Sequence, residues 1–382
     1  MSKIEKMISG DTIVAQATPF GHSGVALVRV SGQDSLKIVE KLTGGSPLKN
    51  RVSTFSKILS PNNDVIDQAL ITYFHAPASY TGENVVEITP HGNPAIVENI
   101  IETICIYGGR IADPGEFTKR AFINGKLDLI QVEAVAALIN SKSKESALAQ
   151  QKIASGDLSK KINDIKGILV STLALVENEI DISEELMGEQ TIASVKTNLI
   201  KTKDLIGGLL ETYRLGKMLF VGLDVIIVGK TNVGKSTLFN ALVKKDVSIV
   251  NQEPGTTRNL IESRVLIDGA VVRVVDTAGV RKTKNPVEKE GLERAKLRAK
   301  KADLILHLID DPAKAMKIKK TEKKLIILTK SDLRKNVRVK KHIIHISAKA
   351  GLGVDGLLDK VKESLGIASL STDTTYLSTL RQ

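Results

Sequence analysis

The chain has 382 residues and a mass of 41.3 kDa, which suits two or three domains, and its 42% of apolar residues excludes global disorder. Aromatic residues make up 3%, which disfavours stacking on exposed bases, whereas the net charge of +12 suits a phosphate-rich partner. The single cysteine, Cys105, excludes an intrachain disulfide and a cysteine-based zinc site; with no signal core or membrane-length apolar stretch, the sequence predicts a cytoplasmic protein.

The first 120 residues are rich in predicted strands. Short apolar runs bounded by Gly, Ser and Pro predict strands at 13–15, 25–30, 69–74 and 85–88. A helical pattern covers 95–106. The sequence therefore predicts an α+β domain over residues 1–120.

The next region, residues 121–216, is predicted to be helical. Gly115 to Glu253 contains no proline, which permits long helices. Apolar residues spaced by threes and fours predict one helical face that packs against a neighbour: Ile162, Ile165, Leu169, Val176 and Ile180.

Residues 217–368 alternate strand and helix patterns, which predicts a mostly parallel sheet covered by helices. Asp268-Gly269 between two apolar runs indicates a hairpin. A short stretch rich in Ser and Thr, 369–382, ends the sequence.

The clearest motif is Gly229 to Ser236, which fits the P-loop pattern G-x-x-x-x-G-K-[S/T]. It follows a predicted strand and opens a helix, so its backbone N–H groups and the helix N-terminus would face phosphate oxygens. Lys235 would reach the β- and γ-phosphates, and Ser236 would bind Mg²⁺. The alternative is a chance glycine-rich turn.

Four companion motifs follow in order. Asp276 to Gly279 ends a predicted strand, where its carboxylate can hold Mg²⁺ through water, and Gly255 to Arg258 lies where a switch loop belongs. Thr329 to Asp332 resembles the guanine-reading motif Asn-Lys-x-Asp, with Thr in place of Asn, and Ser347 to Lys349 would support the base. Together these motifs predict a GTP-binding domain, with ATP as the alternative.

The residue that orients the attacking water is less obvious. Ras-like enzymes place Gln directly after the Asp-x-x-Gly motif, but this sequence has Val280 there. Glu288 is a candidate for the role; its alternative interpretation is a solvated acid at the start of a helix.

Several blocks outside the P-loop region are similar to one family, the tRNA-modification GTPases MnmE, also called TrmE. The resemblance runs from Asp11 to about Gln382 and is carried by these segments: 11–19, 28–32, 79–83 with Glu87, 91–92, 114–118, 120–122, 124–129, 180–181 and 184–185.

The resemblance implies a multidomain α/β architecture. Residues 1–120 would be an α+β domain that dimerises and binds a tetrahydrofolate derivative (5-formyl- or methylene-tetrahydrofolate). A helical domain (121–216) would carry an inserted Ras-like G domain (217–368), and 369–382 would begin the returning helical segment. With the flavoprotein MnmG (GidA), in a heterotetramer, such a protein modifies C5 of the wobble uridine (position 34) of certain tRNAs. It uses GTP and Mg²⁺ and is stimulated by K⁺.

Residue by residue, the resemblance assigns folate contacts to Arg29, Glu87 and Lys126 and the water-orienting role to Glu288. Mg²⁺ would be held by Ser236 and Thr257. K⁺ would be held by Asn232, Asn251, Glu253 and Thr256. The implied nucleotide contacts are Asn232, Val233, Gly234, Lys235, Ser236, Thr237, Asn251, Gln252, Glu253, Pro254, Gly255, Thr256, Thr257, Asp276, Thr277, Ala278, Gly279, Thr329, Lys330, Ser331, Asp332, Ser347, Ala348 and Lys349.

The sequence departs from the family pattern in two places. Asn259 replaces the Asp that usually follows Gly-Thr-Thr-Arg. Family members also continue past the segment 377–381 with further helices and a Cys-Ile-Gly-Lys tail, whereas this sequence stops at Gln382, as a fragment or as a natural truncation. We therefore expect exposed apolar surface on the helical domain, and we interpret Cys105 as a small buried hydrophobe.

Positive charge is concentrated between residues 281 and 341, which contain 21 Lys and Arg against 8 Asp and Glu. This window is either attractive to tRNA phosphates or, the interpretation we favour, a lysine-rich solvated surface. Three functions stay open: a wobble-uridine modification GTPase, a ribosome-associated GTPase switch, and a truncated GTPase without modification activity.

Overall fold

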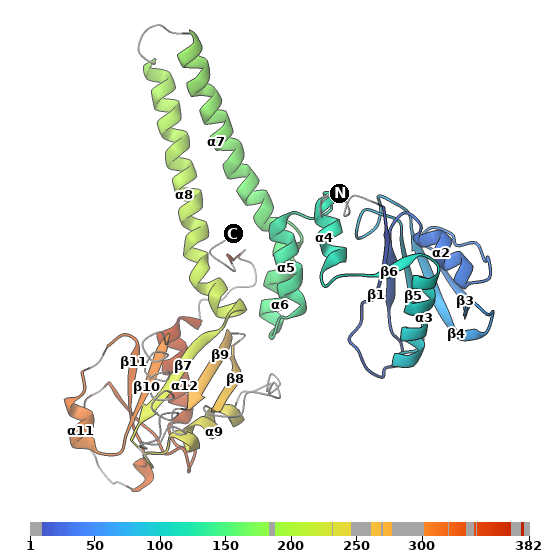
Figure 1. Cartoon of the computed structure of the whole chain (residues 1–382). Coiled ribbons are helices and arrows are strands. Elements are labelled where there is room, and N and C mark those ends of the chain that lie inside the picture. The colour runs from blue at the N-terminus through green and yellow to red at the C-terminus, as the bar shows by residue number, and fades with distance from the viewer. Residues whose placement is uncertain are drawn as a thin grey trace, which may run out of the picture. The chain divides into compact units, whose positions relative to one another are not determined.

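The computed structural model describes residues 10–182, 188–230, 232–245, 261–268, 270–276, 302–319, 321–333, 340, 342–367 and 376–377, without the side chains of 181–182, 214, 243–245, 261–264, 266 and 275–276. The chain forms two compact units, Met1–Val132 and Glu133–Gln382 (Figure 1). No helix among the described residues is long and apolar enough to cross a membrane.

The N-terminal unit contains a six-stranded sheet in its described part, with strand order β3-β4-β5-β2-β1-β6. Its neighbouring strands are antiparallel except β1 and β6, which are parallel. The strands are β1 Thr12–Gln16, β2 Val28–Ser31, β3 Ser53–Leu59, β4 Val65–Phe74, β5 Val85–Thr89 and β6 Gly109–Ile111.

Helices α2 (Ser35–Leu42) and α3 (Pro94–Ile106) contact each other and the strands of this sheet. Asn93 caps α3 by accepting a hydrogen bond from the N–H of Ala95, and Pro94 occupies the first turn, where its missing N–H costs nothing. Alternate residues of the strands, such as Val28 and Val30, are fully buried against the helices. The predicted α+β domain is therefore confirmed.

The helical part contains α5 (Leu129–Ile139), α6 (Lys144–Ala154), α7 (Asp157–Ile182) and α8 (Glu189–Phe220). Helices α7 and α8 form a long antiparallel hairpin (Figure 1). The predicted apolar face of α7 is only partly covered, because Leu169 and Ile180 are 41% and 66% exposed.

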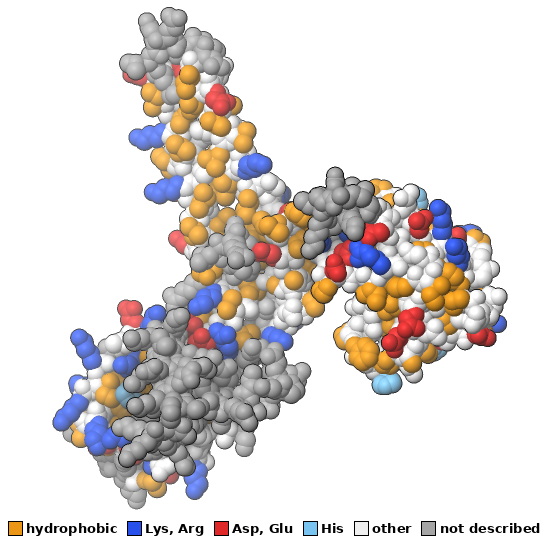
Figure 2. Space-filling view, viewed as in Figure 1, with side chains coloured by type: hydrophobic (Ala, Val, Ile, Leu, Met, Phe, Trp, Pro, Cys, Tyr) orange, Lys and Arg blue, Asp and Glu red, His pale blue; other side chains and the backbone are white. Residues whose placement is uncertain are grey.

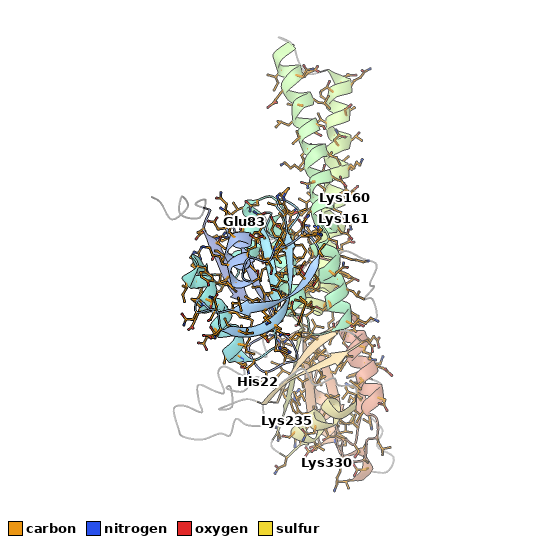
Figure 3. All side chains as sticks on the ribbon, turned by 90° about the vertical axis from the view of Figure 1, so that its right-hand side faces the viewer. His22, Glu83, Lys160, Lys161, Lys235 and Lys330 are labelled. Atoms are coloured by element: carbon orange, nitrogen blue, oxygen red, sulfur yellow. The ribbon has the colours of Figure 1, made fainter. Side chains whose placement is uncertain are left out.

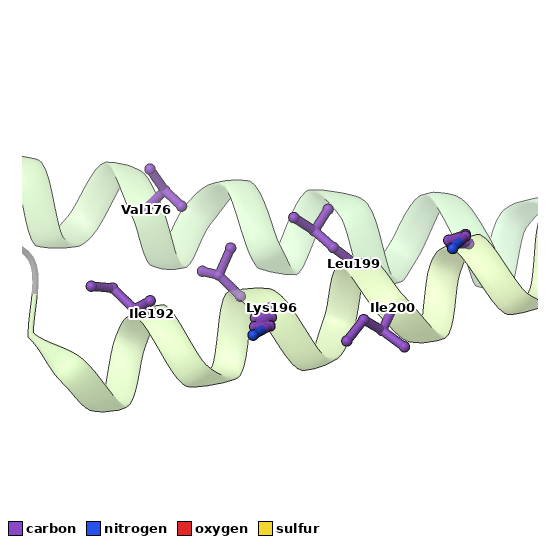
Figure 4. A pocket seen from close by; sticks show the side chains of 7 residues that line it. Val176, Ile192, Lys196, Leu199 and Ile200 are labelled. Carbon is purple, nitrogen blue, oxygen red and sulfur yellow. The ribbon is translucent and has the colours of Figure 1, made fainter.

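Aliphatic side chains remain exposed along the hairpin of α7 and α8 (Figure 2), as expected from the sequence. An open groove of about 410 Å³ lies between the two helices, with Val176 on α7 and Ile192, Leu199 and Ile200 on α8 (Figure 4). No described residue fills it.

The second sheet also has six strands in its described part, in the order β12-β11-β10-β7-β9-β8. All neighbours are parallel except β8 and β9, the predicted hairpin, in which Asp268 has a φ of 46°. The strands are β7 Leu223–Gly229, β8 Ile261–Ile267, β9 Ala270–Asp276, β10 Leu304–Ile309, β11 Lys324–Leu328 and β12 Ile343–His345.

Helices cover both faces of this sheet. On one face, α9 (Lys235–Lys245) and α12 (Val354–Leu365) pack on a core that includes Leu306 and Ile327. On the other face, α11 (Pro312–Lys317) packs near Ile326. Alternate residues of buried parallel strands thus serve two cores, which explains the continuous apolar runs in the sequence.

The end of α8 is tied to the second sheet and to the returning chain. The Nζ of Lys217 lies 3.3 Å from a carboxylate oxygen of Asp303, whose other oxygen accepts from the N–H of Asp224. Leu377 donates its N–H to Thr212 Oγ1, and a Cβ added to Gly216 would collide with the carbonyl oxygen of Leu377. These contacts lie in the last three turns of α8, which ends at Phe220.

We predict that Gly216→Ala lowers the free energy of unfolding by roughly 1–3 kcal/mol, because the new methyl group displaces Leu377. Gly208→Ala in the same helix is the matched control, since a Cβ there meets nothing within 4 Å. The control should be neutral or stabilising by up to about 1 kcal/mol. Equal effects of the two substitutions in urea unfolding would contradict the close packing at Gly216.

Candidate functional site

The carboxyl ends of the parallel strands β12, β11, β10, β7 and β9 lie at one edge of the second sheet. The chain leaves β7 and turns first towards β9 on one side, then returns to β10 on the other side. The crevice at such a switch point is where open α/β sheets bind ligands. The P-loop follows β7 and therefore lies at this point.

The described residues of the P-loop have the geometry of a phosphate cradle. Gly234 has a φ of 99° and Asn232 a φ of 61°, left-handed conformations that Gly and Asn tolerate best. A Cβ at Gly229 would lie 2.6 Å from the carbonyl oxygen of Leu308, so only Gly fits this close approach to β10. Val233 is buried beneath the loop.

Lys235 opens α9 and is 6% exposed. Its Nζ donates hydrogen bonds to the carbonyl oxygens of Gly229 and Lys230, at 3.0 and 2.7 Å. The ammonium group is thus held against the loop itself, and Ser236 and Thr237 follow it on the first turn of α9. A cation in this place, together with the loop N–H groups and the helix N-terminus, suits the phosphates of a nucleotide.

The loops after β11 and β12 lie at the same edge of the sheet. Thr329 is buried and donates its N–H and its hydroxyl to the carbonyl oxygen of Ile309, at 2.8 and 3.3 Å. It therefore joins β11 to β10. Asp332 stays exposed in a short 3₁₀ turn, where its carboxylate is accessible to a base.

The segment Ser347 to Lys349 is held beside the loop that carries Asp332. Ser331 donates its N–H to the carbonyl oxygen of Ile346, and Ser347 exchanges backbone hydrogen bonds with Leu352. Lys330 and Lys235 belong to the same unit (Figure 3). The two loops expected to contact guanine are thus adjacent.

The other predicted residues of this site are not described. Asp276 ends β9, next to Ile227 on β7, but its side chain lies outside the described part. The following predicted site residues lie wholly outside the described residues: Asn251, Gln252, Glu253, Pro254, Gly255, Thr256, Thr257, Thr277, Ala278, Gly279 and Glu288.

A second site lies in the N-terminal unit. Arg29 on β2 and Glu87 on β5 are direct partners in the antiparallel register. Arg29 donates from Nε and Nη2 to Glu87 Oε1, at 2.9 and 2.7 Å, and both side chains remain about a quarter exposed. This is a preformed, accessible ion pair.

Two aromatic side chains that the sequence analysis did not single out lie close to Arg29. The guanidinium carbon of Arg29 lies 5.1 Å from the ring centroid of Tyr80 and 5.8 Å from that of Phe117. The Tyr80 hydroxyl is 2.9 Å from the hydroxyl of Thr118. Both rings belong to sequence blocks that carry the family resemblance, but nothing in their spacing indicates contact with Arg29.

The side-chain stem of the third predicted residue, Lys126, lies against the loop 79–84. Gly82 in this loop has a φ of 78°, and a Cβ there would lie 3.2 Å from Cγ of Lys126. Tyr80 in the same loop lies over Arg29. The loop therefore contacts two of the three proposed residues, Arg29 and Lys126.

A largely buried network of polar side chains holds the loop 79–84 in place. Ser31 Oγ lies 2.7 Å from Thr81 Oγ1 and from Glu83 Oε2. Arg120, whose side chain is 8% exposed, donates to Glu83 and Asp11 and thereby ties the loop to α4 (Glu116–Ile123) and to the start of β1. Buried ion pairs of this kind position their neighbours when each charge is hydrogen-bonded.

Glu116 completes this network. Burial raises the pKa of its carboxyl group, but hydrogen bonds from Arg110, the N–H of Asp113 and Arg120 outweigh burial and hold the pKa at about 2. Arg110 Nη2 and Arg120 Nη2 lie 2.6 and 3.0 Å from Glu116 Oε1. The carboxylate is therefore charged throughout the physiological range.

Cys105 lies on α3 and packs partly buried against the core of the N-terminal unit. Burial, and to a lesser extent the charge of Glu102, raises the pKa of its thiol. The thiol is therefore a poor nucleophile at neutral pH, as expected of a packing residue.

Comparison with known proteins finds matches in both compact units. Residues 12–126 match the family described as GTP-binding protein TrmE N-terminus, and residues 224–345 match the family described as 50S ribosome-binding GTPase. The chain is 41% identical over 355 residues to the tRNA modification GTPase MnmE of Aquifex aeolicus, covering 92% of this chain and 76% of the relative.

Two further relatives carry the same name. The chain is 40% identical to the protein of Francisella philomiragia over 379 residues and 39% identical to that of Legionella pneumophila over 370 residues. Each comparison covers 94% of this chain and 83% of the relative. The similarity therefore extends through both compact units.

We predict that Glu116→Gln lowers the free energy of unfolding at pH 7 by roughly 2–3 kcal/mol. The pKa of Glu116 is lower in the folded chain than in the unfolded chain, where it is near 4.5. Its charged form therefore stabilises the folded state at pH values above about 4.5. That contribution is lost as the pH falls from about 4.5 towards 2, so wild type and variant should converge there. The measurement is urea unfolding at a series of pH values. Exposed Glu98→Gln is the control, and a difference for Glu116→Gln that is constant with pH would contradict the pKa assignment.

Proposed function

The chain belongs to the MnmE family of tRNA modification GTPases and is a GTP hydrolase, and we propose that it modifies C5 of the wobble uridine of certain tRNAs together with the flavoprotein MnmG (GidA). The observation that carries the proposal is the combination of two sites in one chain. The P-loop edge of the second sheet suits GTP, and the N-terminal unit holds the accessible ion pair of Arg29 and Glu87.

In the proposed nucleotide site, Lys235 and the loop N–H groups bind the β- and γ-phosphates, and Ser236 is a Mg²⁺ ligand with Thr257. Asp332 accepts hydrogen bonds from guanine, which offers two adjacent edge N–H groups where adenine does not. The exposed carboxylate of Asp332 and its hydrogen-bonded neighbour loop support this assignment.

Hydrolysis needs a group that orients water and a positive charge at the phosphates. Val280 cannot orient water, so we assign that role to Glu288. We assign a K⁺ site to Asn232, Asn251, Glu253 and Thr256. K⁺ would supply the charge stabilisation that an arginine finger supplies in other GTPases. The exposed Asn232, held in a left-handed conformation inside the P-loop, supports the site.

In the N-terminal unit, we propose that Arg29, Glu87 and Lys126 bind a tetrahydrofolate derivative, either 5-formyl- or methylene-tetrahydrofolate. Among the described residues, Arg29 Nη1 and Glu87 Oε2 have no hydrogen-bond partner. The other polar side-chain atoms, Arg29 Nε and Nη2 and Glu87 Oε1, bond to each other. A donor beside an acceptor suits the amino and carbonyl groups of a pterin ring, and Lys126 suits the carboxylates of the glutamate tail. The bound folate would supply the one-carbon unit.

The same proposal includes a homodimer formed through the N-terminal domain, association with MnmG in a heterotetramer, and a cytoplasmic location. Exposed apolar side chains on the first sheet support an interface, because Phe55 and Leu70 are cross-strand partners and are 66% and 48% exposed. A ribosome-associated switch is the second candidate, favoured by the description of the family that matches residues 224–345. The match of residues 12–126 favours tRNA modification instead.

We predict that GTP turnover rises when K⁺ replaces Na⁺ and that Asn232→Gly removes this rise. Gly is the sharper substitution because it accepts the φ of 61° without strain while removing the amide. The measurement is phosphate release at saturating GTP in the two salts. Equal wild-type rates in K⁺ and Na⁺ would rule out the K⁺ assignment.

Glu288→Ala serves as the matched control in the same assay. Loss of the water-orienting carboxylate should abolish turnover in both salts and leave GTP affinity nearly unchanged, whereas Asn232→Gly should retain the slow turnover seen in Na⁺. Unaltered turnover in Glu288→Ala would show that Glu288 is an ordinary solvated acid.

A further inference from the structure

We propose that Tyr80 and Phe117 are positioning residues that hold the guanidinium group of Arg29 in its ligand-binding orientation, and that the Tyr80–Thr118 hydrogen bond holds the loop 79–84 against α4. The inference deepens the proposed folate site and rests on it for the identity of the ligand.

The ion pair with Glu87 does not by itself fix the orientation of the Arg29 guanidinium plane. Both hydrogen bonds from Arg29 end on one oxygen, Glu87 Oε1, so the pair is a fork on a single acceptor. A bidentate pair uses both carboxylate oxygens and fixes the plane. Here the guanidinium group keeps rotational freedom about Oε1 unless another contact restrains it.

The two rings supply that restraint. The guanidinium carbon lies within 6 Å of both ring centroids, the range in which the quadrupole of an aromatic ring attracts a cation. The rings come from separate segments, because Tyr80 lies in the loop before β5 and Phe117 lies on the first turn of α4. Arg29 is therefore contacted by two segments that are independent of β2.

A hydrogen bond joins the two ring-bearing segments directly. The Tyr80 hydroxyl lies 2.9 Å from Thr118 Oγ1, one residue beyond Phe117. Tyr80 is 36% exposed, so burial alone does not fix its ring. The hydroxyl therefore has a role that a Phe at this position would not fulfil.

The rest of the loop rests on side chains that are not involved in ligand binding. Asn124 donates to the carbonyl oxygen of Thr81 at 2.7 Å, and Arg120 holds Glu83. These contacts fix the base of the loop, while Tyr80 contacts Arg29 and Thr118. Changes at Tyr80 should therefore alter the orientation of Arg29 without unfolding the loop.

The test measures the affinity of the full chain for 5-formyltetrahydrofolate by calorimetry. Tyr80→Leu and Phe117→Leu should each weaken binding roughly 3- to 10-fold, the loss of one partly exposed cation–π contact. Tyr80→Phe and Thr118→Val, which remove only the hydrogen bond, should each weaken it roughly two- to fivefold, and the double variant should match the single ones. Tyr107→Leu, which removes the ring beneath Lys41 in the same unit, is the control and should bind as wild type does.

A double-mutant cycle separates positioning from direct contact or general damage. If Tyr80 acts through Arg29, Tyr80→Leu should have no further effect on affinity in an Arg29→Met background. An additive loss in that background, or unchanged affinity of Tyr80→Leu alone, would overturn the proposal.

A readout without ligand distinguishes failure of this inference from failure of the folate assignment. In ¹H–¹⁵N spectra, the Nε–H resonance of Arg29 should be protected in wild type and exchange-broadened in Tyr80→Leu, while Tyr107→Leu leaves it unchanged. Wild type that does not bind the folate refutes the folate assignment alone. An Arg29 resonance that is identical in wild type and Tyr80→Leu refutes the positioning role.

Discussion

The parallel pairing of β7 with both β9 and β10 is the constraint on which the nucleotide site depends. Parallel strands bring their carboxyl ends to one edge, and the reversal of strand order at β7, with β9 on one side and β10 on the other, opens a crevice there. The P-loop then has to turn within the space left by β10, and the contact of Gly229 with the Leu308 carbonyl oxygen shows how little space remains. The positions of Lys235, Thr329 and Ser347 follow from the strand order.

The N-terminal site depends on a different principle, the pairing of charges in a partly buried setting. Arg120 and Arg110 are compensated by carboxylates from three segments, and this network fixes the loop that carries Tyr80. A buried charge left without its partner would destabilise the fold by several kcal/mol. Because each charge in this network has a partner, the network can hold the loop in one conformation. The exposed pair of Arg29 and Glu87 lies on this support and stays accessible.

Much of the fold could be predicted from the sequence, because local patterns determine it. Short apolar runs predicted β1, β2, β4 and β5, alternating strand and helix patterns predicted the parallel second sheet, and the P-loop motif was placed correctly at the end of β7. Strands β3 and β6 were not predicted, because their sequences contain no continuous apolar run. The start of β2 was wrong by three residues, since Val25 is 59% exposed and precedes the strand. The end of α8 at Phe220 was not predicted, because no Pro or polar break marks it in the sequence.

Some residues of the candidate sites could likewise be predicted from the sequence, and others could not. Motif residues such as Lys235 and Asp332 could be proposed because their spacing along the chain is fixed by the chemistry of phosphates and bases. Tyr80 and Phe117 could not, because they meet Arg29 only through long-range folding, across separations of 51 and 88 residues in the printed sequence. Arg29, Glu87 and Lys126 came from family resemblance, and their spacing alone carries no signal.

The measurement that tests the central claim most directly is mass spectrometry of wobble uridines in tRNA from cells whose only MnmE-family protein is this 382-residue chain. The account predicts uridine modified at C5, which disappears when the chain is removed. Unmodified wobble uridine in cells where the chain is present and hydrolyses GTP would contradict the account and leave a GTPase without modification activity.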